Sequence, residues 1–273
     1  MNPSKLTVKK LKPYNPRTLP LVKKFNLLCE LNETELTALA QMHENSILLN
    51  EQTTFLNQGS HSNKSYIVNR GWAYRYTDLS DGGRQIINFY LPGDIINPLA
   101  ALTPKTAYSV ASITPLELSE FKLEAFINPL ITQSRLGLLY GWMLSRLDSI
   151  MADQTIRIGR LLAYQRTAHL LLEIFHRLEA VGQTKNNTFS MPISQHFLAD
   201  TLGLSLVHMN RTLKKLRINN LVHFNADQVV LKDIIKLKKI AEYQPFDLVQ
   251  TENLLAFLNN KTNPDLKFAY SAA

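Results

Sequence analysis

The segment MPISQHFLADTLGLSLVHMNRTLKKLR, residues 191–217, constrains the fold more than any other part of the chain. Ser194 stands where a first helix would be capped, and Ser205 stands where a second helix would be capped. Gly203, between the two helices, accepts the positive φ angle that a tight turn requires. A small residue, a turn glycine and an apolar residue follow one another at the spacing of a helix-turn-helix: Ala199, Gly203 and Met209. We therefore expect a helix-turn-helix in the C-terminal third of the chain.

Two short strands are expected directly after these helices. The segment NLVHFNADQVVLK, residues 220–232, alternates apolar and polar residues on either side of a turn at 225–228. A β-hairpin in this position is typical of the wing of a winged helix. Because the two motifs together are much more specific than either alone, the sequence predicts a winged-helix domain.

The second helix of the motif has a polar outward face. Met209, Leu213 and Leu216 are expected to hold it on the core. In winged helices its first turns enter the major groove, where Arg pairs with guanine and Asn with adenine, while lysines contact phosphates. We expect the following residues to contact DNA: Ser194, Gln195, Ser205, Leu206, Val207, His208, Asn210, Arg211, Lys214, Lys215 and Arg217. Arg211 is the expected reader of guanine, and Lys215 is an expected phosphate contact.

From about residue 46 to residue 119 the pattern changes to short strand-forming segments separated by turns. The tetrapeptide SDGG at 80–83 is a strong hairpin signal because glycine adopts positive φ without a steric cost. The sequence predicts an antiparallel β-roll here. The expected fold class is α+β, with an N-terminal β-roll, a long helix and a C-terminal winged helix-turn-helix.

The long helix is expected over 131–154. Its apolar positions are spaced alternately four and three residues apart, which is the pattern of a coiled-coil seam. The stripe consists of Leu136, Tyr140, Met143, Leu147, Ile150 and, next in register, Gln154. An amphipathic helix packed on the chain's own core is the alternative. We expect the stripe to pair with its twin in a homodimer.

Basic residues are concentrated at two places in a chain whose net charge is +8. Residues 1–24 hold seven Lys or Arg and no acid, and residues 155–241 hold thirteen basic residues against five acids. Residues 25–154 are acidic, with eight against thirteen. A basic C-terminal third on an acidic body favours a polyanion as partner, although solvated cations on helix faces would give the same counts.

Composition also indicates the cellular compartment in which the protein acts. No apolar run approaches the roughly 18 residues of a membrane span, and the N-terminus lacks the apolar core of a secretory signal. Cys29 is the single cysteine, so we expect no disulfide framework and no thiolate metal site. The sequence predicts a soluble, cytoplasmic protein without membrane contact.

The patterns divide the chain into five parts. Residues 1–24 are expected to form a mobile basic arm, 25–130 the β-roll, and 131–156 the dimerisation helix. Residues 157–243 are expected to form the winged-helix domain, and 244–273 a C-terminal extension.

A β-roll containing GWAYRY and DGGRQIINFYLPGD, followed by a long helix and a winged helix, resembles the Crp/Fnr superfamily of transcription regulators. The resemblance covers about 25–243, and LPGD with LADTLGLSLVHMNRTLKKLR is similar to a branch common in alphaproteobacteria. It implies a jelly roll of the cyclic-nucleotide-binding type as sensor and a homodimer on a palindromic promoter site. It further implies contact with RNA polymerase and a regulator that is not an enzyme.

The effector sites of that superfamily are only partly matched. Its cyclic-nucleotide-binding members hold the ligand with a Gly-Glu pair and, about ten residues on, an Arg-Ser or Arg-Thr pair. Gly93 and Asp94 stand at the first place, and Lys105 and Thr106 at the second. We therefore expect an effector other than cyclic AMP. A cyclic-nucleotide-responsive regulator stays open as an alternative because Lys105 supplies a cation next to the expected arginine position.

Other sensors of the superfamily are matched no better. Its oxygen-sensing branch binds an iron–sulfur cluster through several cysteines, whereas this chain has Cys29 alone. His43 and His61 are weak candidates for a haem ligand, and we predict no cofactor. Val207 replaces a glutamate common in the recognition helix of the superfamily, so we expect a different target sequence.

Two other classes of function stay open. A cupin-like metal-binding or small-molecule-binding barrel would need several His and Glu ligands on neighbouring strands, but the roll offers His61 and scattered acids. His169 and His176 lack a third ligand at metal spacing, so we predict no metal. A protein that uses this fold for interactions other than DNA binding is the third possibility.

Overall fold

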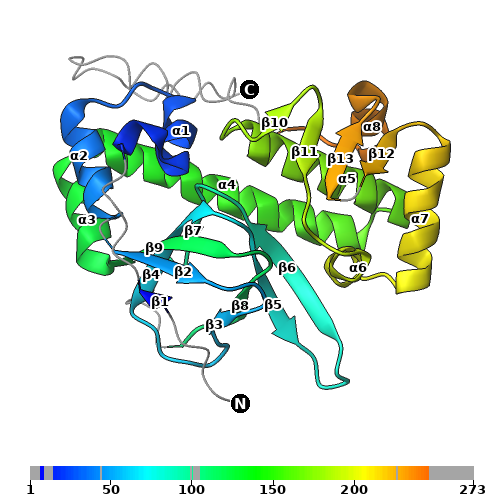
Figure 1. The fold of residues 1–273 in the computed structure, drawn as a ribbon, viewed down its shortest axis with the longest axis horizontal. Helices are drawn as coiled ribbons and strands as arrows, with labels where there is room; N and C mark the ends of the chain where they lie inside the picture. Colours follow the sequence, from blue (N-terminus) through cyan, green and yellow to red (C-terminus); the bar gives the residue numbers. More distant parts are fainter. Residues whose placement is uncertain are drawn as a thin grey trace, which may run out of the picture.

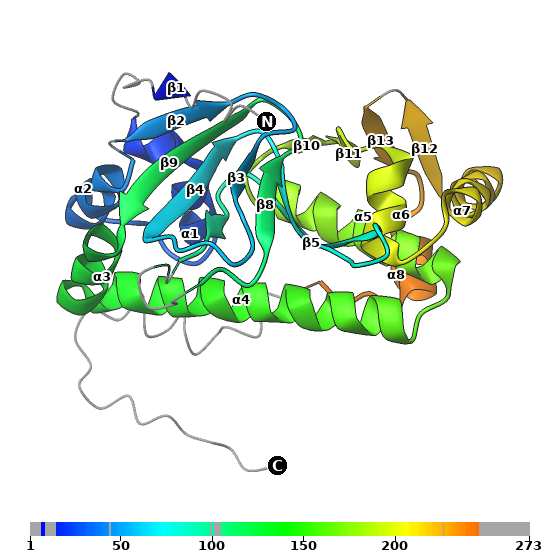
Figure 2. The same cartoon turned by 90° about the horizontal axis from the view of Figure 1, so that it is seen from below.

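The computed structural model describes residues 7–8, 15–43, 45–98, 100, 105–225 and 227–245. A long helix, α4 (Ser134–Gly159), runs along one side of the molecule. The β-roll packs beside its first half, and a second part, made of helices and a small sheet, packs beside its second half (Figures 1 and 2). No helix among the described residues is both long and apolar enough to cross a membrane.

The N-terminal helices lie before the roll: η1 (Pro16–Thr18), α1 (Pro20–Asn26) and α2 (Glu33–Gln41). Leu21, Val22 and Phe25 of α1 are fully buried. They share one core cluster with residues of α2 and α4. The mobile arm predicted for residues 1–24 is therefore wrong over 20–24, because apolar side chains between the prolines and lysines pack into this core.

The roll consists of two antiparallel sheets, with strand orders β1-β2-β9-β4-β7 and β3-β8-β5-β6. Its strands are β1 (Thr7–Val8), β2 (Ser46–Leu49), β3 (Thr54–Leu56), β4 (Lys64–Arg70), β5 (Ala73–Asp78), β6 (Arg84–Tyr90), β7 (Ile95–Ile96), β8 (Ser109–Ser112) and β9 (Leu116–Lys122). Val68, Val110 and Leu118 are completely buried in the core that these strands share. The hairpin predicted at SDGG is confirmed: it joins β5 to β6, and the N–H of Leu79 donates to the carbonyl of Gly83 at 2.8 Å.

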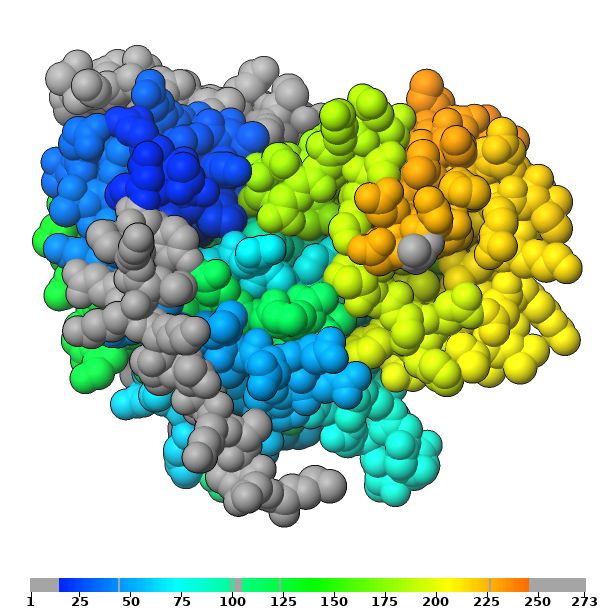
Figure 3. All heavy atoms as spheres, in the orientation of Figure 1, coloured from blue at the N-terminus to red at the C-terminus, as the bar shows by residue number. Residues whose placement is uncertain are grey.

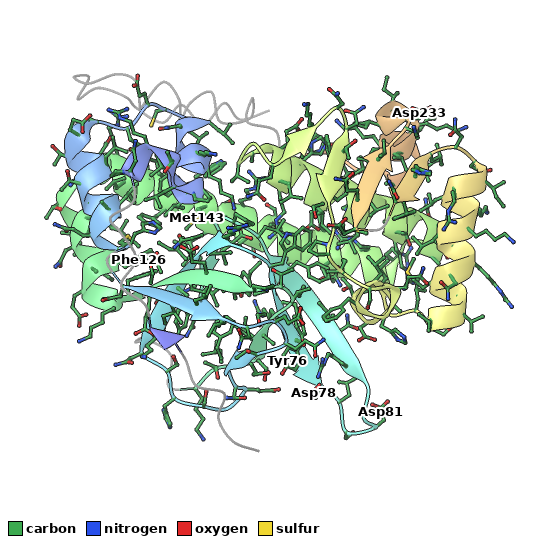
Figure 4. All side chains as sticks on the ribbon, in the orientation of Figure 1. Tyr76, Asp78, Asp81, Phe126, Met143 and Asp233 are labelled. Carbon is green, nitrogen blue, oxygen red and sulfur yellow. The ribbon has the colours of Figure 1, made fainter. Side chains whose placement is uncertain are left out.

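A short helix, α3 (Leu123–Thr132), leads into α4, and the predicted seam of α4 faces the chain's own core. Tyr140 is 1% exposed and lies edge-on to Phe25 and Phe126, with ring centroids 5.4 and 4.6 Å apart. Phe126 and Met143 are both labelled in Figure 4 and lie among the side chains between the helices and the roll.

The structure corrects the predicted dimer interface, because most of its side chains are covered by the same chain. Five of the six are buried and one is partly buried: Leu136, Tyr140, Met143, Ile150 and Gln154, and Leu147, respectively. A second stripe with the same spacing lies one residue further on and is exposed or partly exposed: Gly137, Gly141, Leu144, Asp148, Met151, Thr155 and Ile158. Sequence spacing does not distinguish the two stripes, since both follow the same period, and the more apolar one is used by the core.

The C-terminal part is the predicted winged helix. Its elements are α5 (Ala163–Glu179), β10 (Thr184–Lys185), β11 (Thr188–Ser190), α6 (Gln195–Leu202), α7 (Leu206–Ile218), β12 (Val222–Asn225), β13 (Gln228–Leu231) and α8 (Ile234–Ala241). The small sheet has the order β10-β11-β13-β12, and β12 with β13 forms the hairpin expected around 225–228. The predicted fold class is confirmed.

Both bounds of the long helix change: predicted over 131–156, it runs from Ser134 to Gly159. The extension predicted for 244–273 lies outside the described residues from 246 onward. Figure 3 shows the winged helix as a compact mass beside the roll, with the tip of the β5–β6 hairpin protruding from the roll.

Candidate nucleic-acid interface

The two helices of the motif begin and turn as the sequence predicts. The Oγ of Ser194 accepts the N–H of Phe197 at the start of α6, and the Oγ of Ser205 accepts the N–H of His208 at 3.2 Å at the start of α7. Gly203 has φ +62°, a left-handed conformation that a residue with a Cβ adopts only with strain. α7 is therefore fixed at a defined angle to α6.

Most of the predicted DNA-contacting residues lie in α7, on the side opposite its core anchors. Met209, Leu213 and Leu216 are at most 3% exposed and anchor α7 on the core. Ten of the predicted residues are exposed and Leu206 is partly buried; the exposed ones are Ser194, Gln195, Ser205, Val207, His208, Asn210, Arg211, Lys214, Lys215 and Arg217. In Figure 4 the side chains of α7 extend outward from the edge of the molecule. The face of α7 is thus open to a large ligand.

A hollow of about 590 Å³ lies between the start of α5 and the outward face of α7. Val207, His208 and Arg211 line it from one side, and Tyr164 lines it from the other. The Nζ of Lys215 lies 4.9 Å from the centre of the Tyr164 ring. Tyr164 could not be recognised from the sequence, because its place beside α7 depends on a contact across 51 residues that no local pattern signals.

The C-terminal end of α6 is clasped by three other elements. Gln85 of β6 donates from Nε2 to the carbonyls of Asp200 and Thr201, at 3.0 and 3.2 Å. Gln154 of α4 donates to the carbonyl of Thr201 at 2.7 Å, and Arg166 of α5 donates to the carbonyl of Leu202 at 2.9 Å. These donors satisfy carbonyls that a helix end leaves without intrahelical partners. The β-roll and α4 therefore hold the motif in place directly.

The four residues assigned to an effector pocket do not form one. Lys105 is exposed, and the hydroxyl of Thr106 donates to the carbonyl of Asn57 at 2.5 Å. Gly93 lies under α1, where an added Cβ would be 2.9 Å from the carbonyl of Pro20. None of the four lines the hollow beside α7 or the cavity between α4 and α5. The predicted pocket is corrected, since local backbone contacts use Thr106 and close packing surrounds Gly93.

Asp94 instead belongs to a buried ion cluster. Its two oxygens accept hydrogen bonds from Lys24 Nζ at 2.5 Å and from Arg177 Nη2 at 2.6 Å, and the N–H of Leu91 adds a third at 2.7 Å. Burial alone would raise the pKa of this carboxyl, but the charges of Lys24 and Arg177 outweigh it and lower the pKa to about 2. Asp94 is a structural anion that joins α1 and the roll to α5.

The cluster continues into the winged-helix domain. Arg177 Nη1 donates to Glu173 at 2.8 Å, and Glu173 also accepts from Arg157 at the end of α4. Arg157 contacts the ring of His169 at 3.1 Å. Burial, followed by the charge of Arg157, lowers the pKa of His169 to about 4, so this ring is neutral at pH 7. His169 is therefore part of the packing around this cluster.

An antiparallel roll, a long helix and a winged helix with an exposed basic recognition helix define a DNA-binding transcription regulator. Residues 47–132 match the profile described as a cyclic nucleotide-binding domain, and residues 165–240 match the one described as a Crp-like helix-turn-helix domain. The chain belongs to the Crp/Fnr family.

Individual relatives agree with this assignment. The transcriptional activatory protein AadR of Rhodopseudomonas palustris is 32% identical over 171 residues, which are 62% of this chain and 69% of that protein. The nitrogen fixation regulation protein FixK of Bradyrhizobium diazoefficiens is 27% identical over 64% of this chain and 73% of its own. The solved structure of FixK2 from Bradyrhizobium japonicum has a TM-score of 0.65 at 24% identity and covers 73% of this chain and 98% of that one.

Proposed function

We propose that this protein regulates transcription by inserting the first turns of α7 into the major groove of a promoter site. The observation that carries the proposal is the face of α7, where His208, Asn210 and Arg211 are exposed while the opposite side is anchored in the core. Guanidinium and amide groups at the start of a recognition helix pair with guanine and adenine edges. Lys214 and Arg217 lie further along the helix, where phosphates are the expected contacts.

We further propose that the protein binds as a homodimer through the exposed stripe of α4. Gly141 has open space around its Cβ position, and Leu144 is 37% exposed although it is a large apolar residue. Five of the seven residues of this stripe are glycine or apolar, and Asp148 and Thr155 are polar. Small and apolar residues at alternating spacings of four and three allow two such helices to pack closely. Two copies would present two recognition helices, which suits a palindromic site with half-sites about 34 Å apart.

We also propose that the protein contacts RNA polymerase and acts in the cytoplasm. Both rest on the membership of the chain in a family of transcription regulators. The proposed function requires binding and a change of conformation and needs no catalytic step.

The experiment compares variants on a library of randomised DNA sites at several salt concentrations. Arg211→Ala should cost roughly 1–3 kcal/mol per half-site and flatten the preference at one base pair. Lys214→Ala should weaken all sequences alike and lower the salt slope by about one per half-site. Lys122→Ala, which removes an exposed charge from the roll, is the control. An Arg211→Ala protein with an unchanged base preference would refute the assignment of Arg211.

A further inference from the structure

A cavity lies where α1, α4, α5 and the segment after α8 meet. It measures about 220 Å³, about the volume of seven water molecules in the liquid and smaller than the site of a drug-sized ligand. Leu27, Ile150, Tyr243 and Pro245 supply apolar surface. The cavity is separate from the face of α7 and from the exposed stripe of α4.

Arg146 lies in the wall of this cavity without an acidic partner among the described residues. Its guanidinium lies 5.7 Å from the centre of the Trp142 ring. Arg157 and Arg177, by contrast, are each paired with a carboxylate. Burial, followed by the like charge of Arg177, lowers the pKa of Arg146. A partly buried cation is unfavourable unless an anion compensates it. The charges of Asp94 and Glu173 act on Arg146 from beyond ion-pair distance but do not outweigh burial and Arg177, so the guanidinium can still gain from an anionic partner.

Further polar groups in the wall lack hydrogen-bond partners. The side chain of Arg177 is only 3% exposed, and its Nε has no hydrogen-bond partner within the described part of the chain. The Nε2 of His176 is also buried and unpaired there, while its Nδ1 contacts Glu179 at 3.1 Å. Tyr243 stacks on His176 at 5.7 Å between ring centroids. The cavity thus combines hydrogen-bonding groups at one end with aromatic and aliphatic walls.

Acidic residues limit the charge of a ligand. Glu173 is neutralised by Arg157 and Arg177, and Glu179 is at the exposed rim. Asp153 lies seven residues after Arg146, two turns along α4, and has no ion-pair partner among the described residues. A second negative charge on the ligand would therefore meet a carboxylate at the far end.

We propose that this cavity binds a small organic monoanion, a carboxylate with a short apolar chain. The carboxylate pairs with the guanidinium of Arg146, close to Arg177, and the chain lies against Leu27, Ile150 and Tyr243. Because such a ligand touches α4 on one side and α5 on the other, it would stabilise one arrangement of the winged helix against the roll. This regulatory consequence rests on the proposed function, whereas the binding itself does not.

The test is calorimetric titration of the full-length protein with acetate, butanoate and hexanoate, with butylamine as the cationic control and butanamide as the uncharged control. Affinity should rise with chain length, because apolar area is buried, and both controls should fail to bind. Glutarate, a dianion of similar size, should bind more weakly than butanoate because of Asp153. Arg146→Gln should weaken butanoate and hexanoate by at least about tenfold, the effect of losing a hydrogen bond to a charged group.

Arg160→Gln is the matched control, because Arg160 is exposed at the end of the same helix and outside the cavity. It should bind the acids as the unchanged protein does. Arg146→Gln removes a cation that has no ion-pair partner among the described residues, so the variant should fold with an unchanged or higher unfolding temperature. Thermal unfolding of the same samples measures this. The proposal fails if no acid binds below roughly 10 mM, if butylamine binds equally well, or if Arg146→Gln keeps full affinity. None of these readouts involves DNA, so they are independent of the proposed function.

Discussion

Asp94→Asn provides the most direct test of how the two parts of the molecule are joined. The carboxylate of Asp94 is 7% exposed and faces two cations, Lys24 and Arg177, at 2.5 and 2.6 Å. The amide keeps the shape of the side chain and removes its charge. Arg177 retains Glu173 as a partner, but Lys24 is left as a buried cation without one.

The expected cost follows from this arrangement. Removing one partner of a buried ion pair destabilises a protein by about 3–5 kcal/mol, mainly because the other charge remains buried. Since the total stability of a domain is about 5–15 kcal/mol, this is a large fraction of it. At about 2–4 °C per kcal/mol, the unfolding temperature should fall by roughly 6–20 °C.

Urea unfolding at pH 7 measures the effect, and Asp78→Asn is the matched control. Asp78, labelled in Figure 4, pairs with Arg84 at 3.0 Å on the protruding hairpin, and the two side chains are 62% and 37% exposed. The control should lose about 0–1 kcal/mol. Adding Lys24→Met to Asp94→Asn should recover part of the loss, because the orphaned cation is gone. Equal losses for Asp94→Asn and Asp78→Asn, or a further loss in the double variant, would refute the reasoning.

Two further predictions concern assembly and pH. Leu144→Glu should convert the proposed homodimer to monomers in analytical ultracentrifugation, because it places two like charges in the proposed interface, whereas Leu79→Glu, on the hairpin, should leave the mass unchanged. A dimer that survives Leu144→Glu would exclude this stripe. Burial lowers the pKa of His43 from 6.5 to about 4. Between these two values the unfolded chain binds more protons than the folded one, so the free energy of unfolding falls as the pH drops. At pH 5 this group alone should lower it by about 2 kcal/mol. His43→Gln should remove that part of the loss between pH 7 and pH 5, with His208→Gln as the exposed control, and a variant that still shows the full loss would contradict this cause.

The two helices of the motif and the hairpin of the wing could be predicted from the sequence, because their signals are local. Ser194, Gly203 and Ser205 each act within three or four residues of their own position, through caps and a left-handed turn. The outward face of α7 follows from the spacing of Met209 and Leu213 alone. The function of individual DNA-contacting residues stays a prediction.

What failed depends on contacts between distant segments. The seam containing Tyr140 and the exposed stripe containing Gly141 have the same spacing, and only the presence of α1 and α3 decides which of them is covered. Asp94 was assigned to a ligand because its partners, Lys24 and Arg177, are 70 and 83 residues away. The sequence does not indicate a role for Arg146 either, because a missing ion pair is visible only after the fold is known.

The hydrogen bonds to the C-terminal end of α6 determine how the winged helix can move relative to the roll. Gln85, Gln154 and Arg166 reach adjoining carbonyls from three different elements, and Phe197 of α6 lies edge-on to Tyr74 of the roll at 5.0 Å. Any rotation of the winged helix away from the roll must break the contacts of Gln85, Gln154 and Phe197 together, because all three are made within about two turns of α6. Arg166 belongs to the winged helix itself and moves with it. Partial rotation would lose hydrogen bonds without gaining new ones, so intermediate positions are unfavourable. The geometry of this joint therefore favours an all-or-none transition between two arrangements over a graded response.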